Sequence, residues 1–225
     1  MGLTALAIET NACIGLLGGT FDPIHAGHLA LARAARDGLG LSQLLFIPAA
    51  QPWQKGVITA AEQRARMVEL ALENEPAMGI DRCELERSGP SYTIDTLRAL
   101  RVRFGAQTPL VLIIGADQME RFDTWHEWQS ILRFAHLGVA RRNDAVLVLS
   151  CALQEFYNEH WARVDEIRQQ ACGCVVEVEM APHDASATEV RTLLAAAPTP
   201  ERETRLAQIV PAAVLDYIRA HSLYT

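Results

Sequence analysis

Short apolar runs alternate along this chain with longer segments whose apolar residues recur at helical spacing. Such runs are typical of buried strands in a parallel sheet, because those strands pack on both faces. They predict strands over residues 13–17, 43–47, 78–81, 110–114, 137–140 and 175–180. The last run alternates valine with glutamate, which indicates one solvated face and a place near the edge of the sheet.

In the segments between these predicted strands, apolar residues recur at the spacing of an α-helix. The first follows the turn that ends at residue 28, and its apolar face includes Leu29 and Ala32. The second opens on Thr59–Glu62, which has the spacing of a capping box. The predicted helices cover residues 29–35, 59–73, 92–104, 125–134, 153–170, 186–197 and 211–221.

This alternation predicts an α/β fold, with a doubly wound, Rossmann-like, mostly parallel sheet and helices on both of its faces. The sequence contains no internal repeat and no long linker, so we expect a single domain over residues 1–225. Residues 1–12 are expected to form a loose leader, and residues 186–225 a helical C-terminal part. Ligands of such sheets lie beyond the carboxyl ends of the strands.

Composition narrows the range of partners. A formal net charge of −7 is opposite to that of a nucleic-acid-binding surface, so a phosphate ligand has to be held by a local cluster of groups. The apolar stretch at residues 3–8 is too short to span a membrane and has no basic flank, so no signal peptide is expected. Five cysteines without a Cys-x-x-Cys pair are typical of reduced thiols in a cytoplasmic protein, and no protein metal site is predicted.

The turn at residues 18–28 carries the strongest chemical signal. Gly18 and Gly19 allow a ligand to come close to the backbone, and Gly27 leaves the helix start without a side chain. The helix that begins here directs free N–H groups and its positive dipole end into the turn. His25 and His28 are three residues apart, so they share a face if both lie in the first helical turn. Imidazoles at a helix N-terminus indicate a phosphate or nucleotide site.

Two later loops offer polar groups near strand ends. Lys55 lies in a proline-containing loop after the second strand and can reach a phosphate, although a solvated surface lysine is the plain alternative. Ser91, Tyr92 and Thr93 stand at the start of a predicted helix. Their hydroxyls can cap that helix or, together with free N–H groups, hold a small anion such as an aromatic carboxylate.

The fourth predicted strand is followed by groups suited to a nucleoside. Asp117 can accept hydrogen bonds from a ribose, and Gly115 allows the ligand to approach closely. Trp125 and Trp128 are three residues apart, so one can face the core while the other offers its indole face to a flat pyridine ring. Two neighbouring tryptophans in a helix are otherwise usually core residues.

The last polar motif is Ser186–Arg191. Ser186 and Glu189 have capping-box spacing, which gives both of them a structural explanation. Capping does not explain Thr188 and Arg191. Both lie in the first turns of the same predicted helix, so we expect them to face the anion site at its N-terminus.

Residues 18–28, Gly-Gly-Thr-Phe-Asp-Pro-Ile-His-Ala-Gly-His, resemble the signature of the nucleotidyltransferase superfamily that carries a His-x-Gly-His motif. Ser186–Arg191 is similar to the Ser-x-Thr-x-x-Arg motif with which that superfamily grips a triphosphate. The Gly-Pro-Ser-Tyr-Thr run at 89–93, the Gly-Ala-Asp at 115–117 and Trp125 resemble the acceptor-binding elements of bacterial nicotinate-mononucleotide adenylyltransferases. The resemblance spans nearly the whole chain.

This resemblance implies transfer of the adenylyl group of ATP to nicotinate mononucleotide, giving deamido-NAD and pyrophosphate in NAD biosynthesis. It implies direct in-line attack on the α-phosphorus, with Mg²⁺ held mainly by the phosphates of ATP. The expected partners are these two small molecules, with neither nucleic acid nor membrane. The implied charge-stabilising residues are His25, His28, Lys55 and Arg191. The implied ATP-binding residues are Gly18, Gly19, Thr20, Phe21, Ser186 and Thr188. The implied acceptor-binding residues are Ser91, Tyr92, Thr93, Gly115, Asp117 and Trp125.

Alternatives stay open at this stage. One is an enzyme that prefers nicotinamide mononucleotide or another phosphate acceptor, and another is a regulatory module that binds a nucleotide without turnover. The chain departs from the family pattern at Gln54, where the family commonly has histidine, and at Arg141–Asn143, where it often has Arg-Pro-Gly. The roles of Arg141 and Arg142 and the oligomeric state are also open, and a homo-oligomer is compatible with the sequence.

Overall fold

A computed structural model describes residues 12–51, 58–142 and 147–225. Its strands are β1 (Ile14–Gly19), β2 (Gln43–Pro48), β3 (Met78–Ile80), β4 (Leu110–Gly115), β5 (His136–Arg142) and β6 (Val175–Met180). They form one six-stranded parallel sheet in the order β3-β2-β1-β4-β5-β6. Both ends of every predicted strand are within two residues of the observed ends, and β6 lies at an edge as predicted.

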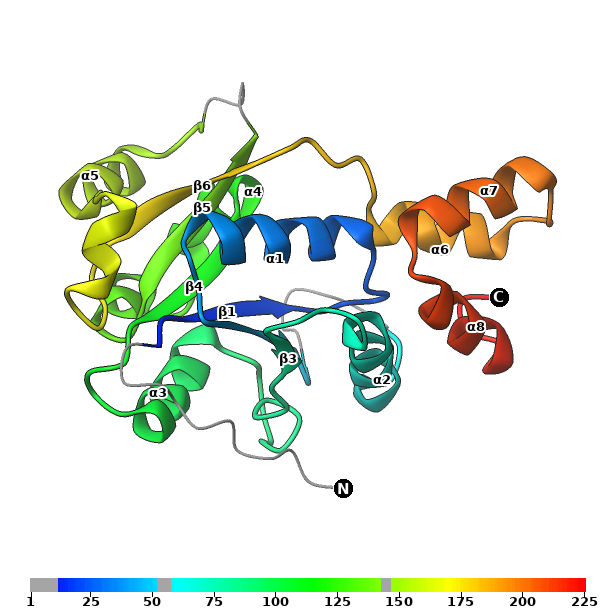
Figure 1. Ribbon diagram of the computed structural model, residues 1–225, viewed down its shortest axis with the longest axis horizontal. Coiled ribbons are helices and arrows are strands. Elements are labelled where there is room, and N and C mark those ends of the chain that lie inside the picture. Colours follow the sequence, from blue (N-terminus) through cyan, green and yellow to red (C-terminus); the bar gives the residue numbers. More distant parts are fainter. Residues whose placement is uncertain (1–11, 52–57, 143–146) are drawn as a thin grey trace.

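The α-helices and the short 3₁₀ helices cover both faces of this sheet (Figure 1). They are α1 (Ala26–Gly38), α2 (Ala61–Leu72), α3 (Thr93–Phe104), α4 (Ala116–Met119), η1 (Phe122–Thr124), η2 (Trp128–Arg133), α5 (Cys151–His160), η3 (Val164–Arg168), α6 (Ala187–Ala195), α7 (Pro200–Ile209) and α8 (Ala212–Ala220). One face packs on α1 and α2 through residues such as Leu29 and Met67, and α7 and α8 pack in turn on α1 and α2. The other packs on α3, α5, η1 and η2 through residues such as Leu97 and Phe122. The fold is therefore the doubly wound α/β class that the alternation predicts.

The chain reverses its direction across the sheet at β1. From β1 it moves outward through β2 and β3, then returns to the other side of β1 and moves outward through β4, β5 and β6. Gly18 pairs with Ile47 on one side, and Leu16 pairs with Leu112 on the other. Open parallel sheets bind ligands beyond the carboxyl ends of the strands at such a switch point. The turn after β1 lies at this point, and Figure 1 shows it leading into α1 at the end of the sheet near α6.

Two of the predicted helices are interrupted, the first of them by a tertiary contact. The helix predicted over residues 153–170 ends at His160, because Trp161 forms a parallel bridge with Val175 of β6 and Ala162 donates to the Val175 carbonyl at 2.9 Å. The helix predicted over 125–134 is replaced by η1 and η2, with Glu127 in the left-handed region between them. Pairing with a sheet edge satisfies backbone groups that a continuous helix would otherwise pair internally.

Helix ends also differ from the predictions. The capping box predicted at Thr59 is wrong: α2 is capped at Ala60 without a side-chain hydrogen bond. Helix α7 is absent from the sequence prediction, although Thr199 caps it by accepting from the Arg202 N–H, and proline follows at its first position. The leader predicted over residues 1–12 lies outside the described residues, except for Ala12. None of the described helices is long and apolar enough to cross a lipid bilayer.

Candidate active site

A cleft of about 750 Å³ opens beyond the carboxyl ends of β1 and β4. It is lined by the β1–α1 turn, the end of β2, the start of α3, the β4–α4 junction and the segment that leads into α6. The structure brings together in its wall most of the predicted site residues: Gly18, Gly19, Thr20, Phe21, His25, His28, Ser91, Thr93, Gly115, Asp117, Trp125 and Ser186. Tyr92, Thr188 and Arg191 do not line the cleft. Lys55 and Gln54 lie outside the described residues.

The two histidines stand at the N-terminus of α1, as predicted. His25 is the N-cap residue, and its backbone N–H donates to His28 Nδ1 at 3.3 Å. Their ring centroids are 3.8 Å apart. The helix N-terminus and both rings therefore face one site, which is the arrangement that suits an anion.

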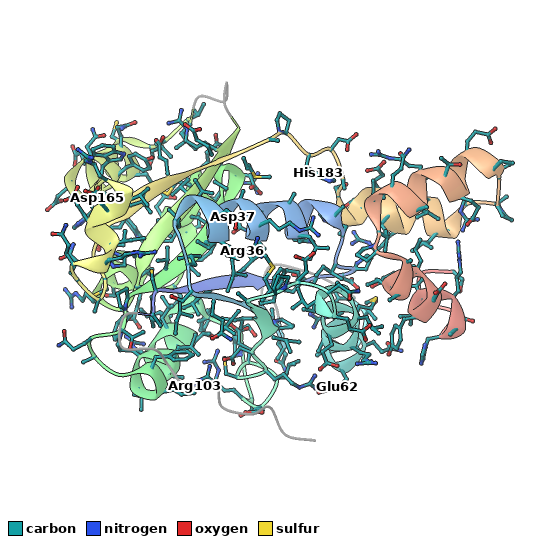
Figure 2. All side chains as sticks on the ribbon, in the orientation of Figure 1. Arg36, Asp37, Glu62, Arg103, Asp165 and His183 are labelled. Atoms are coloured by element: carbon teal, nitrogen blue, oxygen red, sulfur yellow. The ribbon has the colours of Figure 1, made fainter. Side chains whose placement is uncertain are left out.

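His25 is buried, and burial lowers its pKa to about 4, with a further lowering from the nearby charge of His183. The ring is therefore neutral at pH 7. Its Nδ1 is buried and has no hydrogen-bond partner among the described residues. Figure 2 shows His183 beside the start of α1, in the segment that precedes α6. A neutral imidazole can donate a hydrogen bond to a phosphate oxygen, and a bound anion would raise its pKa again.

The glycine turn is shaped for close approach. A Cβ on Gly18 would meet no protein atom within 4 Å and would project into open space, whereas a Cβ on Gly19 would lie 2.7 Å from the Phe21 ring. Phe21 itself has a φ of +51°, in the left-handed region, and its buried ring packs edge-on against His28 at 5.0 Å. Packing of the ring thus holds a backbone conformation that a non-glycine residue rarely adopts.

Helix α6 reaches the same turn from the other end of the chain. Ser186 caps α6 by accepting from the Glu189 N–H at 3.1 Å, as predicted, but the Glu189 carboxylate accepts from Arg205 at 2.7 Å, so the reciprocal half of the capping box is not formed. Arg191 donates through Nη1 to the Asp22 carbonyl at 2.6 Å and through Nη2 to Thr188 at 3.3 Å. Arg191 is therefore placed against the β1–α1 turn, with Thr188 beside it.

The tail of the chain contacts this turn as well. The Tyr224 hydroxyl donates to the Asp22 carboxylate at 2.6 Å. Asp22 is buried and lines the cleft, and sequence reasoning passed over it although it lies inside the motif.

The wall of the cleft near the start of α3 contains a carboxyl group that sequence reasoning missed. Glu84 is buried, lines the cleft and accepts from the Thr96 hydroxyl at 2.6 Å. Burial raises its pKa, partly offset by hydrogen bonds from Thr96 and Ser91. Nothing in the charged run around residue 84 distinguishes this glutamate from the exposed Glu86 nearby.

The start of α3 differs in detail from the prediction. Ser91 accepts from the N–H groups of Ala50 and Gln51 at 3.1 and 3.3 Å, so its oxygen joins α3 to the loop after β2. Tyr92 is the N-cap residue, but its N–H donates to the Pro90 carbonyl at 3.1 Å, so the prediction that this N–H is free is wrong. Thr93 opens the helix and lines the cleft. An anion on this side would meet the Thr93 end of the helix.

The tryptophans divide as predicted, although they do not share one helix. Trp125 is half-buried, lines the cleft and lies 5.3 Å from the Phe122 ring. Trp128 is also partly buried, but it does not line the cleft and packs edge-on against Phe122 and Phe156 of the core. Two short 3₁₀ helices in place of one α-helix therefore still direct one indole toward the cleft.

Arg141 contacts another part of the molecule. Its Nη1 donates to Glu177 on β6 at 2.6 Å, and the same carboxylate oxygen accepts from Tyr157 at 2.6 Å. Arg141 does not line the cleft, and its contact with Glu177 joins β5 to the edge strand β6.

Comparison with known proteins agrees with this geometry. The model of the cytidylyltransferase-like family matches residues 16–193. A probable nicotinate-nucleotide adenylyltransferase of Bordetella petrii is 41% identical over 212 residues, which cover 94% of this chain and 98% of that protein. A relative of the same name from Dechloromonas aromatica is 39% identical, over 94% and 97% of the two chains.

Solved structures share the fold. The Plasmodium falciparum nicotinic acid mononucleotide adenylyltransferase complexed with NaAD superposes with a TM-score of 0.72 at 15% identity, covering 95% of this chain and 97% of that one. A putative nicotinate-nucleotide adenylyltransferase from Vibrio parahaemolyticus superposes with a TM-score of 0.62 at 12% identity, covering 95% of each chain. With a family model that matches most of its length and relatives near 40% identity over nearly all of it, the chain belongs to the cytidylyltransferase-like family, among the nicotinate-nucleotide adenylyltransferases.

Proposed function

We propose that this protein transfers the adenylyl group of ATP to nicotinate mononucleotide, releasing deamido-NAD and pyrophosphate in NAD biosynthesis. The observation that carries the proposal is one cleft that joins a phosphate-binding turn, His25 and His28 to an aromatic face at Trp125 and a helix start at Thr93. The relatives near 40% identity carry the name of this activity. A triphosphate needs the phosphate-binding turn, a pyridine nucleotide needs the aromatic face, and the transfer needs both in one site.

The chemistry is a direct in-line displacement. An oxygen of the mononucleotide phosphate forms a bond to the α-phosphorus of ATP, and the bond from that phosphorus to the bridging oxygen of the leaving pyrophosphate breaks. Such transfers depend on positioning and on stabilising charge, and no covalent enzyme intermediate is needed. We assign charge stabilisation to His25, His28 and Lys55, and to Arg191, whose guanidinium bonds the Asp22 carbonyl and so adds its charge from behind the β1–α1 turn.

The remaining ATP contacts come from the backbone of the turn and the α6 cap. Gly18, Gly19, Thr20 and Phe21 present backbone groups to the phosphates, and Ser186 stands at the α6 N-terminus, which favours negative charge. Thr188 does not line the cleft, so its part is to orient the Arg191 guanidinium.

The acceptor is held on the opposite side of the cleft. Trp125 stacks on the pyridine ring, while Gly115 and Asp117 meet the ribose. The nicotinate carboxylate lies at the start of α3, near Thr93, with Ser91 and Tyr92 shaping that start.

The metal ion of the reaction arrives with the nucleotide. Mg²⁺ prefers oxygen ligands and is commonly bound through substrate phosphates and one or two carboxylates. Among the described residues, no group of three or more His, Cys, Asp or Glu side chains could hold a metal ion, and Asp22 and Asp117 are the aspartates that line the cleft. Bound to the phosphates, Mg²⁺ would neutralise part of their charge. We place the reaction in the cytoplasm, in agreement with five free cysteines.

The test is pyrophosphate release from ATP and Mg²⁺ with each of the two mononucleotides. We expect turnover with nicotinate mononucleotide and a kcat/KM at least about tenfold lower with nicotinamide mononucleotide, since the α3 start favours an anion. Equal kcat/KM values would remove the nicotinate assignment while keeping the transferase. Nucleotide binding without pyrophosphate release would identify a regulatory module instead.

A further inference from the structure

Helix α2 carries a fully buried arginine behind two of the loops that line the cleft. Arg64 donates through Nη1 to the Thr20 carbonyl at 2.6 Å and through Nη2 to the Ala49 carbonyl at 2.7 Å. Its Nε donates to the Thr59 carbonyl at 2.9 Å. Thr20 and Ala49 both line the cleft. A single planar guanidinium therefore joins the β1–α1 turn to the loop after β2.

Two successive peptides of the loop after β2 are held from both sides. Arg64 Nη2 bonds the carbonyls of Ala49 and Ala50, the latter at 3.3 Å, while Ser91 accepts from the N–H groups of Ala50 and Gln51. The C=O and N–H of a planar trans peptide point in opposite directions. Arg64 and Ser91 thus fix the orientation of both peptides and connect the nucleotide side of the cleft to the start of α3.

The same geometry acts on the β1–α1 turn. The Thr20 carbonyl points toward Arg64, so the N–H of Phe21, which belongs to the same peptide, points away from Arg64. Phe21 lines the cleft, and its φ of +51° means that its surroundings have to hold this peptide in place.

Arg64 is also a buried cation without an ion pair among the described residues. Its hydrogen bonds to Thr20, Ala49, Ala50 and Thr59 all go to neutral carbonyls, and the acidic side chain with the largest electrostatic effect on it is Asp22. An arginine stays protonated in proteins even when it is buried. Its charge therefore adds a positive potential beneath the turn where the triphosphate is expected.

We propose that Arg64 is a positioning residue for adenylyl transfer: it fixes the two loops relative to each other and aims the Phe21 N–H at the transferring phosphates. The inference rests on the proposed function for the identity of its substrate. Arg64 touches neither substrate, so it acts through the peptides that it holds.

Two substitutions separate its geometry from its charge. Arg64→Met removes both, and we expect kcat to fall about 100-fold, since a misplacement of about 1 Å in a preorganised site has that effect. Arg64→Lys keeps the charge, but one ammonium cannot bridge two loops as a guanidinium fork does, so we expect a loss of about tenfold. Arg66→Met is the matched control: Arg66 lies on the same helix, is half-exposed and bonds Glu69, so its loss should leave kcat unchanged. The folded fraction of each variant is measured by circular dichroism, and kcat is expressed per folded protein.

Amide hydrogen exchange of the unliganded protein supplies a readout that does not depend on catalysis. In Arg64→Lys the amides of Ala50 and Gln51 should exchange faster than in the wild type, while amides in the β1 strand keep their protection. A folded Arg64→Met or Arg64→Lys protein with kcat within about threefold of wild type would overturn the proposal. So would unchanged exchange at Ala50 and Gln51. If the wild type itself releases no pyrophosphate, the proposed function fails, and the exchange rates alone decide whether Arg64 holds the loop.

Discussion

The two sides of the cleft are built differently. The side that we assign to the nucleotide is formed mainly by one contiguous motif. Arg64 and Arg191 bond backbone carbonyls of this motif, and Tyr224 bonds the Asp22 carboxylate. The side that we assign to the acceptor is assembled from separate segments, at Glu84, Thr93, Gly115 and Trp125. If the proposed assignment holds, rigid support is needed where the reacting phosphates bind, whereas the acceptor side has to distinguish one pyridine from another. Substitutions on the first side should therefore act mainly on kcat, and those on the second mainly on KM.

The largest effect is expected from His28→Ala. Removing one preorganised group that stabilises developing charge typically costs about 10²–10³ in kcat. We expect a loss in this range, with KM for nicotinate mononucleotide nearly unchanged, in steady-state pyrophosphate release. Circular dichroism provides the control for folding. Near-normal turnover in a folded His28→Ala protein would reject the role of His28. It would also contradict the expectation that substitutions on the nucleotide side act mainly on kcat.

The second prediction concerns pH and the buried His25. Its pKa is lowered from 6.5 to about 4 in the folded protein, so between these values the unfolded chain binds more protons than the folded one. The contribution of His25 to the free energy of unfolding is therefore complete above pH 6.5 and is lost as the pH falls toward 4, by about 3 kcal/mol in total. Urea titrations of the wild type and of His25→Gln at pH 7 and pH 4.5 measure it. An equal loss of stability in both proteins would contradict it.

On the acceptor side, Trp125→Ala should raise KM for nicotinate mononucleotide about tenfold, because an aromatic contact contributes about 0.5–1.5 kcal/mol. We expect kcat at saturation to change far less. Trp128→Phe is the control for the aromatic cluster, since Trp128 does not line the cleft. A fall in kcat with an unchanged KM in Trp125→Ala would mean that the two sides do not divide the work in this way.

The smallest effect is expected from Glu84→Gln. The amide oxygen can still accept from Thr96, and the charge that is removed is one that burial already disfavours. Discrimination between the two mononucleotides should shift by no more than about threefold, toward the nicotinate form, because a negative charge near its carboxylate is lost. The ratio of the two kcat/KM values measures this shift. A tenfold or larger change would make Glu84 a main determinant of specificity.

The contrast between the two sides also explains what the sequence could predict. The strands and the β1–α1 turn followed from local pattern, because Gly18–His28 contains its own turn and helix start. Arg64 and Glu84 were missed because a lone charged residue on an amphipathic helix or in a charged run has the same local pattern whether it is solvated or buried. The break at Trp161 depends on a bridge to Val175, which no local spacing encodes. Lys55 stays a prediction, since it lies outside the described residues.

The contact between Tyr224 and Asp22 has a consequence for ligand affinity. A carboxylate in the wall of the cleft repels a polyanion, and donation from the phenol draws part of that negative charge toward the opposite side of the carboxyl group. We therefore expect Tyr224, which follows α8, to affect how strongly the β1–α1 turn attracts a nucleotide. Tyr224 lies 202 positions from Asp22 in the sequence, and we expect Tyr224→Phe to weaken ATP binding while the fold stays intact.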